Sequence, residues 1–202
     1  MEKYKDIKEE FKRIGKFICD KGLNNSHSGN MSVRIGDRIL ITRRGSMLGF
    51  LKDDDIIETG LYRDDFGIAL ASSEVNVHRA ILKNTSALAV IHTHLIHAVV
   101  LSFSQNEIIP IDVEGGYVLK KIPIIEVEFG SGSKEMEEKI PLVLQKFPIV
   151  VVKGHGAFSI GKTLEEALYY ASALEDISRI IYKVKLLGIN TDNLIKETLT
   201  KW

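Results

Sequence analysis

Two histidines at the end of an apolar run are the residues of this chain whose types and spacing most clearly indicate chemistry. They are His92 and His94, which close the run that starts at Val90. Alternate side chains of a β-strand point to the same face, so on a strand both imidazoles would point the same way. Neutral imidazole is the commonest nitrogen ligand of transition metals in proteins. The pair therefore predicts half of a metal site.

A third imidazole and a carboxylate elsewhere in the chain could complete that site. His155 stands between two glycines directly after an apolar run, and such glycines let the backbone turn sharply and approach a neighbour closely. Glu74 stands at the expected start of a helix. Three imidazoles with one open position, which a carboxylate can fill or leave, are typical of catalytic zinc sites. Each residue alone has an ordinary structural interpretation, but the four together favour a metal centre.

The other three histidines carry a weaker signal. His97 would lie on the helix after His94 and could support the metal ligands from behind. His78 follows Glu74 by one helical turn and is expected to pack or to form hydrogen bonds. His27 lies in a polar loop and could contact a ligand. For each of the three the structural interpretation is favoured.

Three short segments combine small residues with hydroxyl, amide or guanidinium donors. They are residues 28–30, 43–45 and 72–73. The serines at 72 and 73 precede a helix, whose free N–H groups and dipole favour an anion. Helix capping and ordinary turns explain each segment taken alone. Beside a metal site, the three segments together favour an anion pocket.

The rest of the sequence predicts helices and strands that would position these residues. Strands and helices do not alternate strictly, which favours a mixed, largely antiparallel sheet with helices on its faces. Glycine and aspartate at 36–37 indicate a hairpin turn. Apolar spacing predicts helices over 4–21, from 72 onward, and over 96–103, 134–146 and 164–187. It predicts strands over 31–35, 38–42, 56–57, 68–70, 88–92, 122–127, 149–153 and 157–160.

Length and composition narrow the class of protein. The 202 residues suit a single domain over 1–202, and 45% hydrophobic with 27% charged residues is an ordinary globular mixture. Equal numbers of basic and acidic residues give a net charge of zero, which disfavours nucleic acid and an anionic membrane as partners. One cysteine, Cys19, and a charged N-terminus without an apolar signal segment predict a cytoplasmic protein.

Taken in chain order, these motifs resemble those of the class II aldolase/adducin family, in particular its zinc-dependent L-fuculose-1-phosphate aldolases. The likeness covers nearly the whole chain, in order and in spacing. It runs through GLN (22–24), SGNMSVR (28–34), LITRRG (40–45), SSE (72–74), HTHLIH (92–97), GHG (154–156) and TLEEA (163–167). The resemblance implies a three-layer α/β/α fold. It also implies a cyclic homotetramer whose active sites lie at subunit interfaces.

The resemblance further implies roles for individual residues. A single Zn²⁺ per chain would be bound by His92, His94 and His155. Glu74 would be the fourth ligand at rest and the catalytic acid/base once substrate displaces it. Arg44 stands where the family usually has threonine, and it would contribute its backbone N–H and a charge. The phosphate would be bound by Gly29, Asn30, Arg44, Gly45, Ser72 and Ser73.

The implied reaction is the cleavage of a ketose 1-phosphate to dihydroxyacetone phosphate and an aldehyde. The substrate would be L-fuculose 1-phosphate, a close relative of it, or a deoxypentulose phosphate. Zinc would act as a Lewis acid that stabilises the enediolate, and the carboxylate would move the proton. A lysine Schiff base is not required.

One position departs from the family pattern and keeps alternatives open. The fuculose-phosphate enzymes of this family use a tyrosine from a neighbouring subunit to protonate the aldehyde-side oxygen. Glu114 stands at that position here, and Tyr117 lies close but offset, so either could be the secondary acid. The first alternative is a methylthioribulose-1-phosphate-type dehydratase, which has the same fold and metal set. A ribulose-phosphate 4-epimerase ranks lower, because that branch has aspartate where this chain has Glu74. An adducin-like interaction module is disfavoured, since such modules lose the metal ligands.

Overall fold

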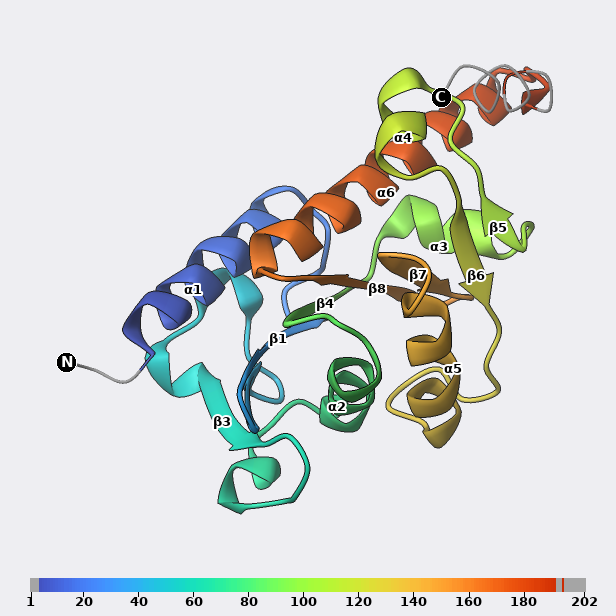
Figure 1. The fold of residues 1–202 in the computed structure, drawn as a ribbon. Helices are drawn as coiled ribbons and strands as arrows, with labels where there is room; N and C mark the ends of the chain where they lie inside the picture. Colours follow the sequence, from blue (N-terminus) through green and yellow to red (C-terminus); the bar gives the residue numbers. More distant parts are fainter. Residues whose placement is uncertain (1–3, 192–193, 195–202) are drawn as a thin grey trace.

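A mixed eight-stranded sheet lies between two layers of helices (Figure 1). The computed structural model describes residues 4–191 and Leu194. The strand order is β3-β2-β1-β4-β8-β7-β6-β5, and neighbouring strands are antiparallel except for the parallel pair β6–β7. The strands are β1 (Asn30–Ile35), β2 (Arg38–Thr42), β3 (Ile56–Gly60), β4 (Ala89–Thr93), β5 (Glu107–Ile108), β6 (Ile122–Ile125), β7 (Ile149–Val152) and β8 (Gly156–Gly161). The expected mixed, largely antiparallel sheet is confirmed.

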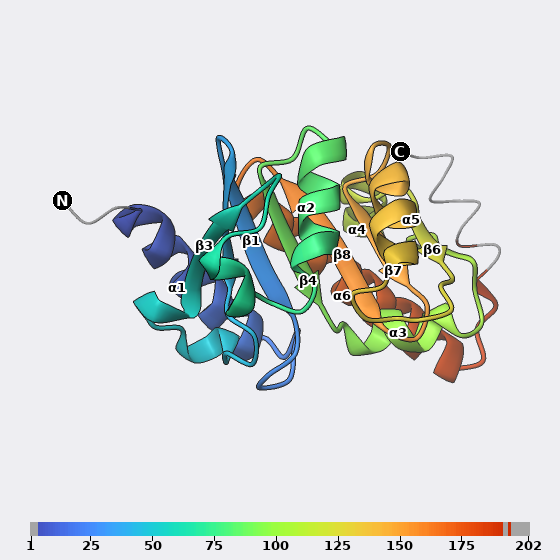
Figure 2. The same ribbon diagram turned by 90° about the horizontal axis from the view of Figure 1, so that it is seen from below.

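Helices cover both faces of the sheet. One layer contains α1 (Lys5–Asp20), α3 (Ile96–Ser102), α4 (Val113–Val118) and α6 (Leu164–Leu186). The other layer contains α2 (Val75–Asn84) and α5 (Lys134–Leu144), and Figure 2 looks onto it from below. This is the expected three-layer α/β/α architecture.

The alternation of side chains along β4 explains why there are two buried cores. Ile91 packs with the α1 and α6 side chains on one face of the sheet, whereas Val90 packs with those of α2 and α5 on the other. Since the period of a strand is two, His92 shares the Val90 face. Its imidazole stacks on Phe158, which belongs to the same core, with ring centroids 4.2 Å apart.

Several predicted elements differ from those observed. The strand expected at 68–70 is wrong: Phe66–Ala69 is a 3-10 helix, η3. Its start is set by Asp65, whose side chain accepts a hydrogen bond from the backbone N–H of Gly67 at 3.0 Å and so bends the chain. Two further 3-10 turns, η1 (Leu48–Phe50) and η2 (Asp53–Asp55), were not expected. Helix α4 and the two-residue strand β5 were also missed, because both are too short for a periodic pattern.

Helix α2 starts at Val75, one residue after Glu74, the expected carboxylate. Glu74 is the N-cap of α2. The hydroxyl of Ser72 accepts a hydrogen bond from the Glu74 N–H at 3.3 Å, and the carbonyl of Ser72 accepts one from the Val75 N–H at 3.0 Å.

Among residues 4–191 and 194, no helix combines the length and apolar composition that a membrane crossing would need.

Candidate metal centre and anion cavity

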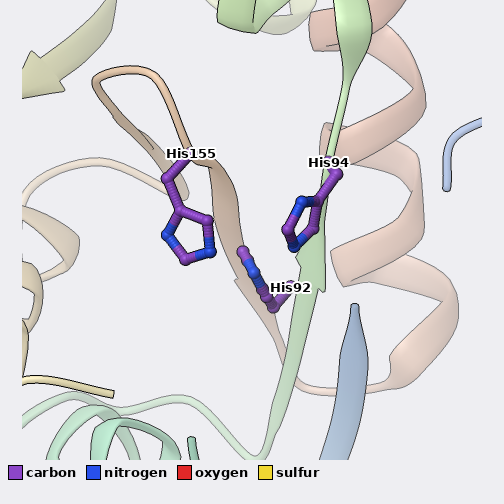
Figure 3. A group of neighbouring side chains, drawn as sticks. All are labelled: His92, His94 and His155. Atoms are coloured by element: carbon purple, nitrogen blue, oxygen red, sulfur yellow. The ribbon is translucent and has the colours of Figure 1, made fainter. Parts of the chain in front are cut away.

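Two neighbouring strands bring three imidazoles to one point. His92 lies on β4, His94 lies one residue past its end, and His155 lies in the turn between β7 and β8. Each residue offers one ligand nitrogen, and these nitrogens lie within 4.8 Å of one another. Ring centroids are 4.7 Å apart for His92–His94 and His92–His155, and 4.9 Å apart for His94–His155. Figure 3 shows the three rings gathered around a common space.

The glycine after His155 is required for this convergence. A Cβ atom on Gly156 would lie 2.4 Å from the carbonyl oxygen of Thr93 and 3.0 Å from a ring carbon of His92. No side chain fits at the first of these distances, so only glycine lets β8 pack this closely against β4. The close approach expected from the glycines that flank His155 is therefore observed.

The hydrogen bonds of His92 determine which of its nitrogens can bind a metal. Its Nδ1 lies 3.0 Å from the carbonyl oxygen of Ala157, which can only accept, so Nδ1 carries the hydrogen and donates it. The lone pair is then on Nε2. Among the described residues this buried atom has no hydrogen-bond partner. An imidazole fixed from behind by a carbonyl, with its other nitrogen unsatisfied, is typical of a metal ligand.

All three imidazoles are held in the neutral form that binds metal. Burial lowers the pKa of His92 well below the usual value of 6.5, and the neighbouring His155 and His94 lower it further. Burial is also the largest cause of the lowered pKa values of His94 and His155. An imidazolium would lose most of its hydration here, so the neutral base is favoured.

The carboxylate of Glu74 lies beside the imidazoles. Its Oε2 is 3.4 Å from Nε2 of His92, and its Oε1 is 3.9 Å from Nε2 of His155. The side chain is almost fully buried, and within the described part of the chain its Oε1 accepts no hydrogen bond. Three neutral nitrogens beside an unsatisfied carboxylate oxygen are a donor set that suits Zn²⁺. The residues present therefore fit the expected metal.

A cavity of about 210 Å³ opens beside this cluster. Its lining includes Glu74, His94 and His155 together with every residue expected to bind phosphate: Gly29, Asn30, Arg44, Gly45, Ser72 and Ser73. Arg43, which belongs to the expected 43–45 segment, also lines this cavity. Ser46 and Ser131 were not expected here, although residues 130–133 are all glycine or serine. The expected metal ligands Glu74, His94 and His155 and the expected anion donors thus line one cavity.

Two details of the anion cavity concern the expected phosphate-binding residues, and the first corrects an expectation. The backbone N–H of Arg44, expected to contact phosphate, donates instead to the carbonyl of Leu70 at 3.0 Å. The guanidinium of Arg44 is therefore the group that this residue can offer. The amide of Asn30 donates to Oε2 of Glu74 at 2.8 Å, so its side chain is engaged with the carboxylate.

The loop before β1 is hydrogen-bonded to the metal cluster through Asn24, a residue to which the sequence assigned no role in the site. The Oδ1 atom of Asn24 accepts a hydrogen bond from the backbone N–H of His94 at 2.6 Å. Gly29 makes this possible, because its φ is +76° and a Cβ atom there would lie 2.1 Å from Nδ2 of Asn24. In the sequence, Asn24 is the last residue of the GLN segment (22–24) that resembles the family and the first of a polar loop rich in asparagine and serine.

Other expected site residues lie elsewhere in this single chain. Glu114 lines a separate cavity of about 270 Å³ between α4 and α6, and Tyr117 on α4 is 76% exposed. His97 forms a 2.6 Å hydrogen bond with Glu175 of α6 and is not part of the metal cluster. His78 is fully buried and hydrogen-bonded, as expected, and His27 lines the anion cavity.

Residues 9–182 match the family model of the class II aldolase and adducin N-terminal domain. The chain belongs to this family. An L-fuculose phosphate aldolase from Methanocaldococcus jannaschii is 32% identical over 176 residues, which cover 86% of this chain and 94% of the relative. The Escherichia coli L-fuculose phosphate aldolase is 30% identical over 166 residues, 79% of this chain and 74% of the relative.

A solved structure of a class II aldolase family member has the same fold. The L-fuculose-1-phosphate aldolase from Thermus thermophilus superposes with a TM-score of 0.85 at 30% identity, over 90% of this chain and 95% of that one. These similarities make the chain an enzyme of the class II aldolase type. The family depends on a metal, and the His92, His94 and His155 group could bind one.

Proposed function

We propose that this class II aldolase is zinc-dependent and cleaves a ketose 1-phosphate to dihydroxyacetone phosphate and an aldehyde. The proposed substrate resembles L-fuculose 1-phosphate or a deoxypentulose phosphate. One observation carries the proposal: the three-imidazole cluster, the Glu74 carboxylate and an anion cavity lined by serines and arginine share one space. A substrate with a carbonyl at one end and a phosphate at the other matches that arrangement.

Each group of the chain has a distinct task in this proposal. Zinc held by His92, His94 and His155 would supply Lewis-acid polarisation of the ketose carbonyl. The cavity binds the phosphate and so fixes the adjacent carbons against the imidazoles. When the bond between the third and fourth carbons breaks, the protonated form of Glu74 delivers its proton to the third carbon and dihydroxyacetone phosphate results. The hydroxyl on the fourth carbon loses one proton as the aldehyde forms, so the cleavage consumes no net proton. The Oε1 atom of Glu74, which has no hydrogen-bond partner among the described residues, is available for that proton.

The hydroxyl at the aldehyde end must lose a proton in the same reaction. Within one chain, Glu114 and Tyr117 lie outside the metal cavity, on α4. The proposal therefore places the secondary acid/base on a neighbouring copy, in a homotetramer with active sites at subunit interfaces. The 76% exposure of Tyr117 and the 61% exposure of Val113, about one helical turn earlier on α4, are compatible with a surface that a second copy covers. The single cysteine supports a cytoplasmic enzyme.

A substrate panel tests the proposed reaction. The purified enzyme is incubated with several ketose 1-phosphates, and release of dihydroxyacetone phosphate is measured alongside loss of water. Release of dihydroxyacetone phosphate with an equal amount of aldehyde is the expected result. Loss of water without cleavage would replace the aldolase with a dehydratase, and conversion to an epimeric sugar phosphate would replace it with an epimerase.

A further inference from the structure

A chain of buried hydrogen bonds leads away from the carboxylate of Glu74. Asn30 donates through Nδ2 to Oε2 of Glu74, the Oδ1 of Asn30 faces Nε2 of His78, and Nδ1 of His78 lies 2.6 Å from the hydroxyl of Ser32. His78 and Ser32 are fully buried, and neither lines the anion cavity. The proposed reaction uses neither residue directly.

The two-residue period of strand β1 and the four-residue spacing on helix α2 together produce this series of hydrogen bonds. Asn30 and Ser32 are two residues apart on β1, so their side chains share a face of the sheet. Glu74 and His78 are four residues apart at the start of α2, so they share a face of the helix. Where α2 packs over β1 and β4, the two pairs interleave. Asn30 is also the strand partner of His92, which places its amide next to the metal cluster.

The direction of each hydrogen bond is set by the carboxylate. An ionised carboxylate only accepts, so Asn30 must present its NH₂ group to Glu74 and its carbonyl oxygen to His78. His78 must then carry its hydrogen on Nε2, which leaves Nδ1 as an acceptor for the Ser32 hydroxyl. Burial lowers the pKa of His78 to about 3, in agreement with a neutral ring. Each hydrogen bond from Ser32 to Glu74 therefore has only one possible donor and one possible acceptor.

We propose that Ser32 and His78 are positioning residues: through the Asn30 amide they hold Oε2 of Glu74, and so leave Oε1 as the oxygen that carries the proton. This inference rests on the proposed function, in which Glu74 moves the proton. Oε2 has its hydrogen bond from Asn30, whereas Oε1 has none among the residues the structure describes. The partnered oxygen is therefore fixed and the other is free to exchange a proton with substrate.

Core packing alone does not account for these polar groups. Burying a hydroxyl, an imidazole and an amide costs free energy that their mutual hydrogen bonds mainly offset, and apolar side chains of the same shape are often equally stable there. Second-layer hydrogen bonds that orient a functional carboxylate have a different benefit, since their loss typically lowers activity. This series of hydrogen bonds ends at Glu74, and the orientation of the Glu74 carboxylate matters for the proposed reaction.

The test compares His78→Leu, His78→Gln and Ser32→Ala with the wild type, each measured for kcat, KM, bound zinc and thermal unfolding. His78→Leu is expected to lower kcat roughly 10- to 100-fold, with KM and zinc content near wild type. Glutamine can donate to Asn30 as Nε2 of His78 does, so His78→Gln should recover most of the turnover. Ser32→Ala removes only the last link and should lower kcat about fivefold.

A matched control separates positioning from packing. Ser159 is buried like Ser32, on β8, and donates to the Ile91 carbonyl at 3.3 Å outside the chain of hydrogen bonds. Ser159→Ala should change thermal stability as Ser32→Ala does, and leave kcat unchanged. If the two alanine variants lower kcat equally, the positioning role is wrong. This comparison remains decisive even if His78→Leu does not fold.

A double-mutant cycle tests the route through Asn30. Once Asn30→Ala has removed the amide, His78→Leu or Ser32→Ala should cause no further loss of kcat, because nothing remains for them to orient. Equal losses in both backgrounds would overturn the inference and leave the proposed function intact. Full turnover in Glu74→Gln would instead overturn the proposed role of Glu74 itself. The two failures are thus distinguishable.

Discussion

The metal-side cavity and the cavity between α4 and α6 differ in how their polar groups are held. Beside the three histidines, buried partners fix two of the groups: the Ala157 carbonyl fixes His92, and Asn30 fixes Glu74. Between α4 and α6, Glu114 and Asp176 lie on the open surface, and Asp176 already pairs with Arg179. One chain therefore brings together the groups of the proposed carbonyl and phosphate end of the site, and we propose that a second copy supplies the aldehyde end.

Of the substitutions considered, Glu74→Gln in the metal-side cavity should lower turnover most. We expect kcat to fall roughly 10²- to 10⁴-fold, the usual contribution of a general acid/base. Zinc should remain bound, because the three imidazoles are unchanged. Turnover and metal content are measured on the same preparation. Wild-type turnover would remove Glu74 as the acid/base, and a fall in zinc that matches the fall in kcat would reduce it to a ligand.

Removing the guanidinium of Arg44 should weaken substrate binding more than the chemical step. Arg44→Ala is expected to raise KM for the sugar phosphate about tenfold, a modest effect for a charge-assisted hydrogen bond because the side chain is exposed. Arg43→Ala is the matched control, since Arg43 pairs with Asp55 at 2.8 Å and should change KM less. Steady-state kinetics of both variants decides; equal changes would assign no special role to Arg44.

Substitutions on α4 test whether the second cavity belongs to the reaction. Glu114→Gln should lower kcat by less than Glu74→Gln does, at most roughly 10²-fold, and should leave bound zinc unchanged. Tyr117→Phe should have the smaller effect of the two, because its position is offset from that of the family tyrosine. If both variants turn over at the wild-type rate, α4 does not supply the secondary acid.

The buried histidines should also make the stability of the metal-free protein depend on pH. Burial lowers the pKa of His78 from 6.5 to about 3, so below about pH 6.5 the unfolded chain binds a proton that the folded chain does not. Stability contributed by the neutral ring is thus present above pH 6.5 and falls as the pH decreases toward 3. Chemical denaturation of His78→Gln should show a shallower pH slope than wild type, by up to about 1.4 kcal/mol per pH unit. Identical slopes would contradict a neutral, buried His78.

The sequence predicted those parts of the site that depend on local spacing. The sequence places His92 and His94 at the end of an apolar strand and His155 in a glycine turn, and the structure shows the same local arrangement. The mixed sheet followed from the irregular order of strands and helices. Each histidine motif is decided by residues within a few positions of one another, and the sheet type by the order of elements along the chain.

Contacts between distant segments could not be predicted in this way. The bond from Asn30 to Glu74 joins residues 44 positions apart, and the bond from His94 to Asn24 joins residues 70 apart. The Arg44 N–H was assigned to phosphate, although Leu70, on a turn that was predicted as a strand, accepts it. Such errors occur where tertiary packing, rather than periodicity, selects the partner of a polar group.

The zinc content of the purified chain tests the central claim most directly. The account predicts about one zinc per chain, removed by a chelator with loss of dihydroxyacetone phosphate release and restored with activity on titration with zinc. His94→Ala should bind far less. A wild-type chain that takes up no metal on titration, and still cleaves the sugar phosphate, would contradict the account.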